Sequence, residues 1–283
     1  MPPALLGTSF LLILVGFGTK VGLVPLHTWL PDAHSQAPSP VCLLLSGVET
    51  SAVLYVILRM IPIASQANGL NAGTWAQVFG LLSVGVAAFL ILQVRDYKRL
   101  FAFSTVEHMG IIITAMGIGS AGAAYGTAYQ LMAHALTKSL SFLVAGLVLL
   151  SFATRNIKDV RGLIRVSPLA GGSLLIAGLA IGGAPPFVVF LSEFSIFRAG
   201  IVAGDYVVVG LLALFVGIAF FGIMWHIGQM VFGEPKEEME RVTLPLSSRI
   251  ALVLAGIPVL LLGVYLPEPL HKLLHLAAVA LTR

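Results

Sequence analysis

The stretch that decides the fold runs from Lys20 to Arg59 and reads KVGLVPLHTWLPDAHSQAPSPVCLLLSGVETSAVLYVILR. A proline-rich loop separates two apolar segments, and a lysine lies inside the first of them. A helix that crosses the hydrocarbon core of a membrane takes roughly 20 apolar residues, and an ionisable side chain there is costly unless it is paired or faces a wet cavity. The stretch therefore predicts membrane-spanning helices that carry functional charge.

The composition of the whole chain supports this interpretation. Hydrophobic residues make up 58% of the 283 residues and charged residues 10%, against about 45–50% and about 25% in a soluble domain. The single cysteine, Cys42, excludes a disulfide framework and any iron–sulfur or zinc site built mainly on thiolates. The net charge of +4 comes from basic residues in short loops, which indicates membrane orientation rather than nucleic-acid binding.

Eight apolar segments of membrane-spanning length follow one another along the chain. Strands of a membrane β-barrel would be ~10 residues long with alternating polarity, and no such alternation is present. The chain is therefore predicted to be an all-α polytopic membrane protein with about eight transmembrane helices. The segments are 4–24, 38–61, 73–94, 100–118, 122–151, 169–199, 206–232 and 249–266.

Glycine and proline interrupt two of these segments. Residues 16–25 of the first read GFGTKVGLVP, and residues 182–187 of the sixth read GGAPPF. Proline removes a backbone donor and clashes with the preceding turn, while glycine loosens the helix. Each break lies beside an intramembrane charge, Lys20 in one and Glu193 in the other. Paired interrupted helices of this kind indicate a transporter built from inverted repeats.

The loops differ in their content of lysine and arginine. One set of alternate loops holds ten of these residues, and the opposite set, with the C-terminal tail, holds four. Basic loops stay in the cytoplasm, so the first set is predicted to face the cytoplasm from a cytoplasmic (inner) membrane, with both chain ends on the outer side. The first set is Arg95, Lys98, Arg99, Arg155, Lys158, Arg161, Arg165, Lys236, Arg241 and Arg249; the second is Arg59, Arg198, Lys272 and Arg283.

Further ionisable residues fall inside the apolar segments and are candidates for moving ions. A desolvated lysine can exchange a proton near neutral pH whereas an arginine keeps its proton, and histidine already titrates in that range. The two basic residues not counted with the loops are lysines, Lys20 and Lys138, which fits a proton relay. The candidates are Lys20, Lys138, Glu193 and His134, followed by Glu107, His108 and Glu49.

Structural alternatives stay open for each candidate. A long lysine side chain can reach an interface from within a segment, which would explain Lys20 and, less easily, the mid-segment Lys138. Glu193 lies close to Arg198 and could be interfacial, and His134 could be a core histidine with satisfied hydrogen bonds. Glu107, His108 and Glu49 could instead have structural roles at partly solvated positions. His226, beside Trp225, is predicted to be an anchor at the membrane interface.

The stretch 20–59 closely resembles the signature of the antiporter-like subunits of respiratory complex I, membrane-bound hydrogenases and Mrp-type cation/proton antiporters. The resemblance continues through DYKRLFAFSTVEHMG at 96–110, HALTK at 134–138, RGL at 161–163, the prolines at 185–186 and SEF at 192–194. Within this family, SPVCLLLSGV and STVEHMGII are most similar to the hydrogenase-4 and formate-hydrogenlyase type of subunit.

The resemblance implies an architecture and a set of roles. Family members have about fourteen helices, with two inverted repeats of about five each, and this chain resembles the last eight: a remainder of the first repeat (1–61), the second repeat (73–232), and a C-terminal helix and tail (249–283). The family's roles fall on Lys20 in the first broken helix, Lys138 and His134 on the central axis, and Glu193 where a proton leaves. Glu49 departs from the pattern, and the helix that normally supplies a glutamate to Lys20 is not among the eight.

Three functions follow as hypotheses. The first is a proton-translocating subunit of a membrane-bound oxidoreductase of hydrogenase or NADH:quinone type, with no cofactor or metal of its own and with other membrane subunits and a peripheral redox arm as partners. The second is a subunit of a Mrp-type cation/proton antiporter, in which sodium could replace the proton. The third is a structural piece that conducts nothing. The lipid bilayer is the expected surroundings, and no nucleic acid is expected as a partner.

Overall fold

The structure is a computed structural model that describes residues 3–66, 71–235 and 241–282. Within these ranges the chain forms helices and no strands, with 82% of residues helical. The helices are α1 (Pro3–Val21), α2 (Trp29–Gln36), α3 (Ser39–Leu44), a π-helical turn η1 (Leu45–Glu49), α4 (Thr50–Ala64), α5 (Ala72–Gln93), α6 (Tyr97–Gly117), α7 (Ala121–Phe152), α8 (Leu163–Val166), α9 (Pro168–Ile181), α10 (Val188–Ala203), α11 (Tyr206–Phe232), α12 (Leu246–Val264) and α13 (Glu268–Thr282).

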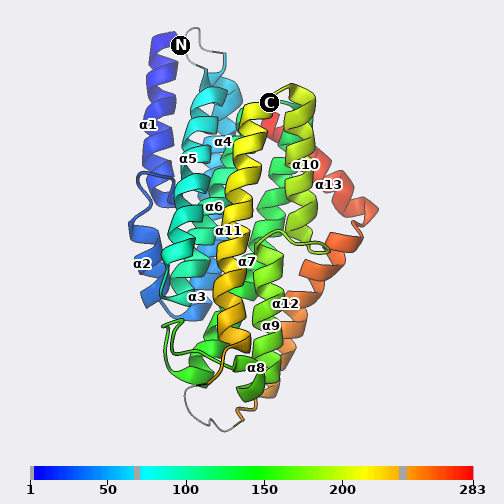
Figure 1. Ribbon diagram of the computed structural model, residues 1–283. Coiled ribbons are helices and arrows are strands. Elements are labelled where there is room, and N and C mark those ends of the chain that lie inside the picture. The colour runs from blue at the N-terminus through cyan, green and yellow to red at the C-terminus, as the bar shows by residue number, and fades with distance from the viewer. Residues whose placement is uncertain (1–2, 67–70, 236–240, 283) are drawn as a thin grey trace.

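The long helices lie side by side in one elongated bundle, with the start of α1 and the end of α13 at the same end (Figure 1). In the described part of the chain, six helices are long and apolar enough to cross a membrane, with α3, η1 and α4 counted as one, and α1 and α9 are shorter apolar helices. These eight helices correspond to the eight predicted segments. The all-α membrane architecture is thus confirmed.

Both predicted breaks are present. The first broken helix ends at Val21 and resumes as α2, and the second ends at Ile181 and resumes as α10. Each break has a glycine of positive φ within two residues of the helix end, 85° at Gly22 and 76° at Gly183, and each contains a cis X-Pro peptide bond. Positive φ is a conformation that glycine adopts readily and other residues do not, so these glycines suit the points where the two helices stop.

Helices α6 and α7 form the centre of the bundle. In an apolar 18-residue window of α6, 89% of the residues are buried, compared with 22% in α11 and 11% in α12. Helix α5 approaches α6 closely, since a Cβ on Gly80 would lie 2.7 Å from the carbonyl oxygen of Gly110. Small residues permit such close contact between membrane helices. The least apolar spanning helix, α6, is therefore shielded by its neighbours, and the most apolar one, α11, faces outward.

The prediction of a tail after residue 266 is wrong in that residues 268–282 form a helix, α13. Helix α13 packs against α7 and α4. The OH of Tyr125 on α7 lies 2.8 Å from Nδ1 of His271, and Arg59 donates to the carbonyl oxygen of Ala280. These contacts fix a segment whose sequence alone is too short and too polar to predict a span.

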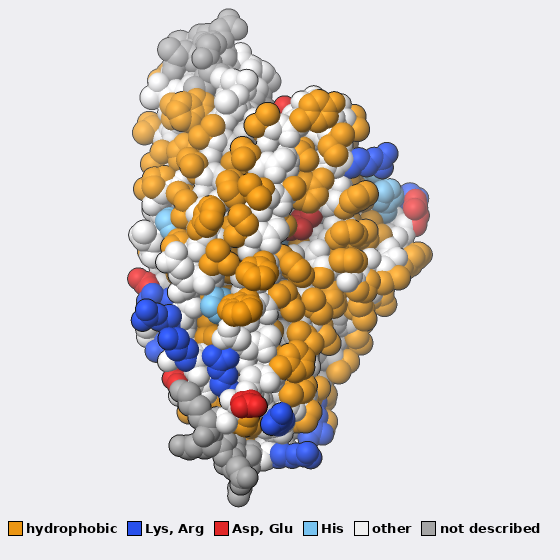
Figure 2. All heavy atoms as spheres, viewed as in Figure 1, with side chains coloured by type: hydrophobic (Ala, Val, Ile, Leu, Met, Phe, Trp, Pro, Cys, Tyr) orange, Lys and Arg blue, Asp and Glu red, His pale blue; other side chains and the backbone are white. Residues whose placement is uncertain are grey.

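The loop charges gather as the sequence predicts. Lysine and arginine side chains cluster at the end of the bundle that holds the α5–α6, α7–α8 and α11–α12 connections (Figure 2). Lys236 and Arg283, both counted in the prediction, lie outside the described residues. We call this the basic end.

Four of these basic residues lie in helices rather than in loops, namely Lys98, Arg99, Arg165 and Arg249. Lys98 belongs to the first turn of α6 and is 1% exposed. The carboxylate of Asp96 accepts from the backbone N–H groups of Lys98 and Arg99 and so caps the helix. Helix α6 therefore begins at Tyr97 rather than near residue 100, and the Lys98 ammonium donates to the carbonyl oxygen of Ala37.

Candidate functional site

Buried ionisable side chains come together where α6, α7 and α10 meet, in a set that we call the central axis. Lys138 and His134 are 0% exposed, and the others are exposed by at most 5%. Such groups are rare inside membrane spans and mark ion pathways. The set brings together Lys138, His134, His108, Glu107 and Glu193 from three helices.

Lys138 lies near the middle of α7 and points toward α6. Its Nζ donates to the carbonyl oxygen of Phe101 at 2.6 Å and to Oγ of Ser104 at 2.5 Å. Both acceptors are neutral, and among the described residues no carboxylate lies within ion-pair distance of this Nζ. Lys138 therefore lacks the direct carboxylate partner of a structural ion pair, and a lysine, unlike an arginine, can exchange its proton.

Two histidines continue the axis on either side of the α6–α7 contact. The ring centroids of His108 and His134 lie 5.2 Å apart. Nε2 of His108 lies 3.0 Å from the carbonyl oxygen of Ile181, and its Nδ1 lies 3.0 Å from the amide nitrogen of Gln130. A carbonyl accepts and an amide NH2 donates, so this pair of bonds assigns the proton of the neutral His108 ring to Nε2.

His134 is held in a similar way. Its Nε2 lies 3.1 Å from the carbonyl oxygen of Ser46, so Nε2 is the donor. Its Nδ1 is buried and has no hydrogen-bond partner among the described residues, and the same holds for Oε2 of Glu107. The histidine and the glutamate each keep one polar atom that can exchange hydrogen bonds within the axis.

The axis reaches the second break through neutral side chains. The hydroxyl of Ser192 donates to the amide oxygen of Gln130, whose NH2 faces His108. Glu193, the next residue on α10, is 5% exposed, and a Cβ on Gly183 would lie 2.4 Å from its Oε2. The carboxylate of Glu193 therefore lies directly against the backbone of the α9–α10 break.

A separate pair of charges lies at the first break. Nζ of Lys20 is 2.6 Å from Oε1 of Glu49, and the two side chains are 47% and 34% exposed. The same ammonium lies 5.2 Å from the ring centroid of Trp29, whose Nε1 donates to the carbonyl oxygen of Thr19. No partner for Lys20 was predicted within the chain, and the structure supplies Glu49.

The π-helical turn η1 joins the two groups of charges. Glu49 is its last residue and reaches Lys20, while Ser46 offers its carbonyl oxygen to His134 and its hydroxyl to Thr105 at 2.7 Å. Single π-helical turns inside longer helices occur frequently at functional sites. Glu49, where the sequence departs from the family pattern, therefore lies in a turn where the helix changes from α to π geometry.

All seven candidate residues thus fall into these two groups, five in the central axis and two at the first break. Gln130, Ser104 and Ser46 also belong to the site, although none of them was predicted from the sequence. A signal existed for Gln130, because it precedes His134 by four residues just as His134 precedes Lys138, and residues four apart share a helical face. Neutral Ser104 and Ser46 gave no such signal, since their contribution depends on contacts between helices.

Comparisons with known proteins agree with this architecture. Residues 4–222 match the family model described as NADH:quinone oxidoreductase/Mrp antiporter, transmembrane. A hydrogenase-4 component F homolog of Methylacidiphilum infernorum is 39% identical over 93% of this chain and 55% of its own length. An NADH-quinone oxidoreductase subunit N of Desulforudis audaxviator is 30% identical over 90% of this chain and 53% of its own length.

Solved structures show the same fold. A chain of the membrane-bound sulfane sulfur reductase, an archaeal respiratory membrane complex, superposes with a TM-score of 0.91 at 27% identity, over 99% of this chain and 57% of that one. A chain of the Mrp complex from Dietzia gives a TM-score of 0.86 at 18% identity, over 97% of this chain and 58% of that one, which shows the fold alone. This chain spans about half the length of the curated relatives it matches.

Proposed function

The chain belongs to the NADH:quinone oxidoreductase/Mrp antiporter transmembrane family, and from that premise we propose that it translocates protons as a membrane subunit of a multisubunit oxidoreductase of hydrogenase-4 or NADH:quinone type. The observation that carries the proposal is Lys138, a fully buried lysine held by neutral acceptors in the middle of a membrane-spanning helix. No stability argument requires a lysine there, whereas proton exchange does.

The residues of the axis divide into groups that hold a proton and groups that orient them. Lys138, His134, His108 and Glu193 each carry an ionisable group that can bind and release a proton. Gln130 and Ser192 stay neutral and fix the ring of His108 relative to α10. A proton taken up at Lys138 would pass along the histidines, with bound water completing the path, and leave at Glu193.

A charge that moves nearby would drive this relay. Opposite charges within about 4–6 Å favour ionisation and like charges oppose it, so a change in one group alters the proton affinity of the next. The energy would come from a redox reaction in a peripheral arm, with the chain supplying no redox centre of its own. The basic end would face the cytoplasm from the cytoplasmic membrane, as the distribution of loop charges favours.

The second candidate function is that of a Mrp-type cation/proton antiporter subunit. The likeness to the Mrp complex is one of fold, and the relatives at 30–39% identity carry hydrogenase and NADH-quinone oxidoreductase names. Hard cations also take oxygen ligands, whereas the centre of the axis is built from lysine and histidine nitrogens. Both observations favour protons over sodium.

The test is redox-driven proton uptake in inverted membrane vesicles that carry the assembled complex. We expect Lys138→Ala to abolish uptake while the complex assembles normally, and we expect Lys272→Ala, whose side chain is 72% exposed, to leave it unchanged. Uptake that continues in Lys138→Ala would overturn the relay and favour the structural, non-conducting role. Uptake that requires sodium in the wild type would favour the antiporter.

A further inference from the structure

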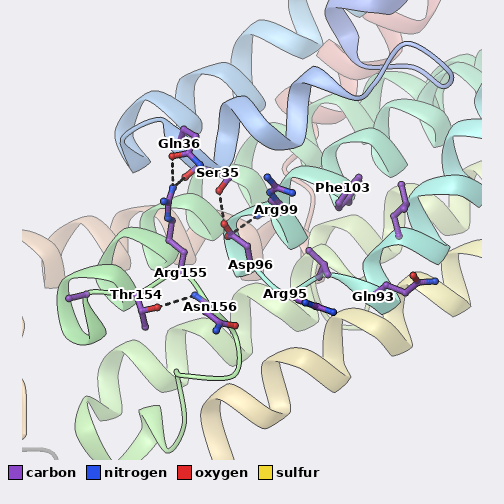
Figure 3. A pocket seen from close by; sticks show the side chains of 13 residues that line it. Ser35, Gln36, Gln93, Arg95, Asp96, Arg99, Phe103, Thr154, Arg155 and Asn156 are labelled. Atoms are coloured by element: carbon purple, nitrogen blue, oxygen red, sulfur yellow. Dashed lines mark hydrogen bonds between the residues drawn. The ribbon is translucent and has the colours of Figure 1, made fainter.

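A polar cavity lies at the basic end, away from the central axis. Its volume is about 750 Å³. As Figure 3 shows, its walls come from the end of α2, the turn between α5 and α6, and the loop that follows α7. Three arginines line it, together with the apolar side chains of Leu90 on α5 and Phe103 on α6.

The walls of this cavity are fixed by backbone hydrogen bonds. The N–H of Ile157 donates to the carbonyl oxygen of Arg95 at 2.9 Å, and the N–H of Tyr97 donates to that of Arg155 at 3.2 Å. These bonds form an antiparallel bridge between Asp96 and Asn156. The loop after α7 is therefore held in place against the α5–α6 turn, so the arginines are positioned before any ligand arrives.

The positive charge of the cavity is only partly compensated. Arg155 donates through Nη1 to the carbonyl oxygen of Ser35 at 2.5 Å and to Oε1 of Gln36 at 3.1 Å, both of them neutral acceptors. Arg95 is exposed, and its guanidinium makes no ion pair or hydrogen bond with another described residue. Of the three arginines, only Arg99 has a carboxylate partner, Asp32 at 2.6 Å.

Asp96 does not neutralise this charge by a direct ion pair. Its carboxylate accepts from the hydroxyl of Ser35 at 2.5 Å and from the backbone N–H groups of Lys98 and Arg99 at 2.7 and 3.2 Å. Its oxygens are thus engaged in capping α6 and in holding α2. Among the residues that the structure describes, the guanidinium groups of Arg95 and Arg155 have no carboxylate partner, and both line one cavity.

We propose that this cavity binds the phosphate headgroup of an anionic phospholipid. Guanidinium groups match the geometry of phosphate oxygens and bind them through paired hydrogen bonds. The cavity lies where the membrane-spanning helices α5 and α6 meet their basic loops, which is the level of lipid headgroups, and basic pockets at this level bind anionic headgroups. Leu90 and Phe103 provide the apolar side along which an acyl chain leaves the headgroup for the bilayer.

The test is lipid retention by the purified full chain, measured by native mass spectrometry from detergent micelles supplied with phosphatidylglycerol or with phosphatidylcholine of the same acyl chains. We expect selective retention of phosphatidylglycerol. The variant Arg95→Gln leaves the recorded side-chain contacts of the loop intact and should weaken retention about fivefold, since a basic residue near the headgroups contributes about that factor. Arg95→Gln combined with Arg155→Gln should weaken it further.

The matched control is Lys158→Gln with Arg165→Gln, which removes the same two charges from exposed positions at the same end, outside the cavity. Equal loss in the control and the cavity double variant would overturn the proposal, because attraction to the whole basic end would then explain retention. Equal retention of phosphatidylcholine would also overturn it. Displacement of the lipid by inorganic phosphate alone would assign the cavity to free phosphate and contradict a lipid ligand.

Discussion

The two breaks share a backbone design and differ in what surrounds their charges. At the second break, Glu193 is 5% exposed and lies beside an axis that runs through three helices. At the first break, the side chains of Lys20 and Glu49 are 47% and 34% exposed and pair mainly with each other. Both helices stop at a glycine of positive φ and resume after a proline-containing connection.

The two breaks illustrate two ways in which a membrane span can accommodate a charged side chain. An ion pair compensates its own charges and tolerates an open side, whereas an isolated carboxyl needs enclosure and neighbours that can exchange protons with it. We therefore expect the second break to govern proton movement and the first to govern the stability of the local fold. The predictions that follow test this division.

The largest effect should come from exchanging carboxylates for amides at the two breaks. Glu193→Gln removes a titratable group from the end of the axis and should reduce proton uptake about a hundredfold, the scale on which a positioned proton-transfer group contributes. Glu49→Gln should reduce uptake by less than about tenfold, because Lys20 stays in place and the axis is untouched. Both are measured as redox-driven uptake in inverted vesicles. Equal losses in the two variants would refute the division between the breaks.

The next effect concerns stability at the first break. Removing only one partner, as in Glu49→Met, leaves an unpaired lysine within the span and should lower the free energy of unfolding by about 2–3 kcal/mol. The double variant Lys20→Met with Glu49→Met should be close to neutral, since an apolar pair can replace an ion pair of similar volume. Denaturant unfolding in micelles measures both values. A double variant as unstable as the single one would contradict this role of the pair.

The glycines of the two breaks provide a matched pair of smaller changes. Alanine at either Gly22 or Gly183 places a side chain in a left-handed conformation, which costs about 1–2 kcal/mol. At Gly22 the new Cβ would lie 2.6 Å from a terminal carbon of Leu30, whereas at Gly183 it would lie 2.4 Å from the carboxylate of Glu193. Thermal unfolding should therefore shift in both variants, and proton uptake should fall only in Gly183→Ala. A loss of uptake in Gly22→Ala would show that the first break also conducts.

The smallest effect should come from a histidine outside both groups. Nε2 of His226 on α11 lies 3.0 Å from the carbonyl oxygen of Ile91. His226→Leu removes this bond and should lower the free energy of unfolding by about 1 kcal/mol. Proton uptake by the assembled complex should stay at the wild-type rate. A reduced rate with unchanged stability would add His226 to the conducting residues.

Much of the fold could be predicted from the sequence because lipid imposes a simple rule on it. Helices long enough to span the membrane appear as apolar segments, and glycine with proline marks where a span stops, so the eight segments and both breaks were predictable. Helix α13 was not, because residues 268–282 are amphipathic and their helical state depends on packing against α7 and α4.

The site was predictable for its ionisable members only. A charge in an apolar segment stands out in the sequence, and this identified Lys138 and Glu193. The pairing of Lys20 with Glu49, the burial of Lys98 and the bridging role of Gln130 depend on how helices face one another, and the spacing of residues along one helix does not contain that information.

The π-helical turn η1 also determines the directions in which Ser46 and Glu49 project from the helix. In an α-helix, Ser46 and Glu49 would be separated by roughly 60° around the axis. A π-helical turn contains more residues per turn and widens this separation to roughly 115°. The same turn can therefore contact helices on two different sides. Ser46 contacts α6 and α7, and Glu49 contacts α1. The geometry of η1 therefore fixes how the Lys20–Glu49 ion pair is oriented relative to the central axis. Conversion of this turn to an α-helical turn would rotate the ion pair relative to the axis.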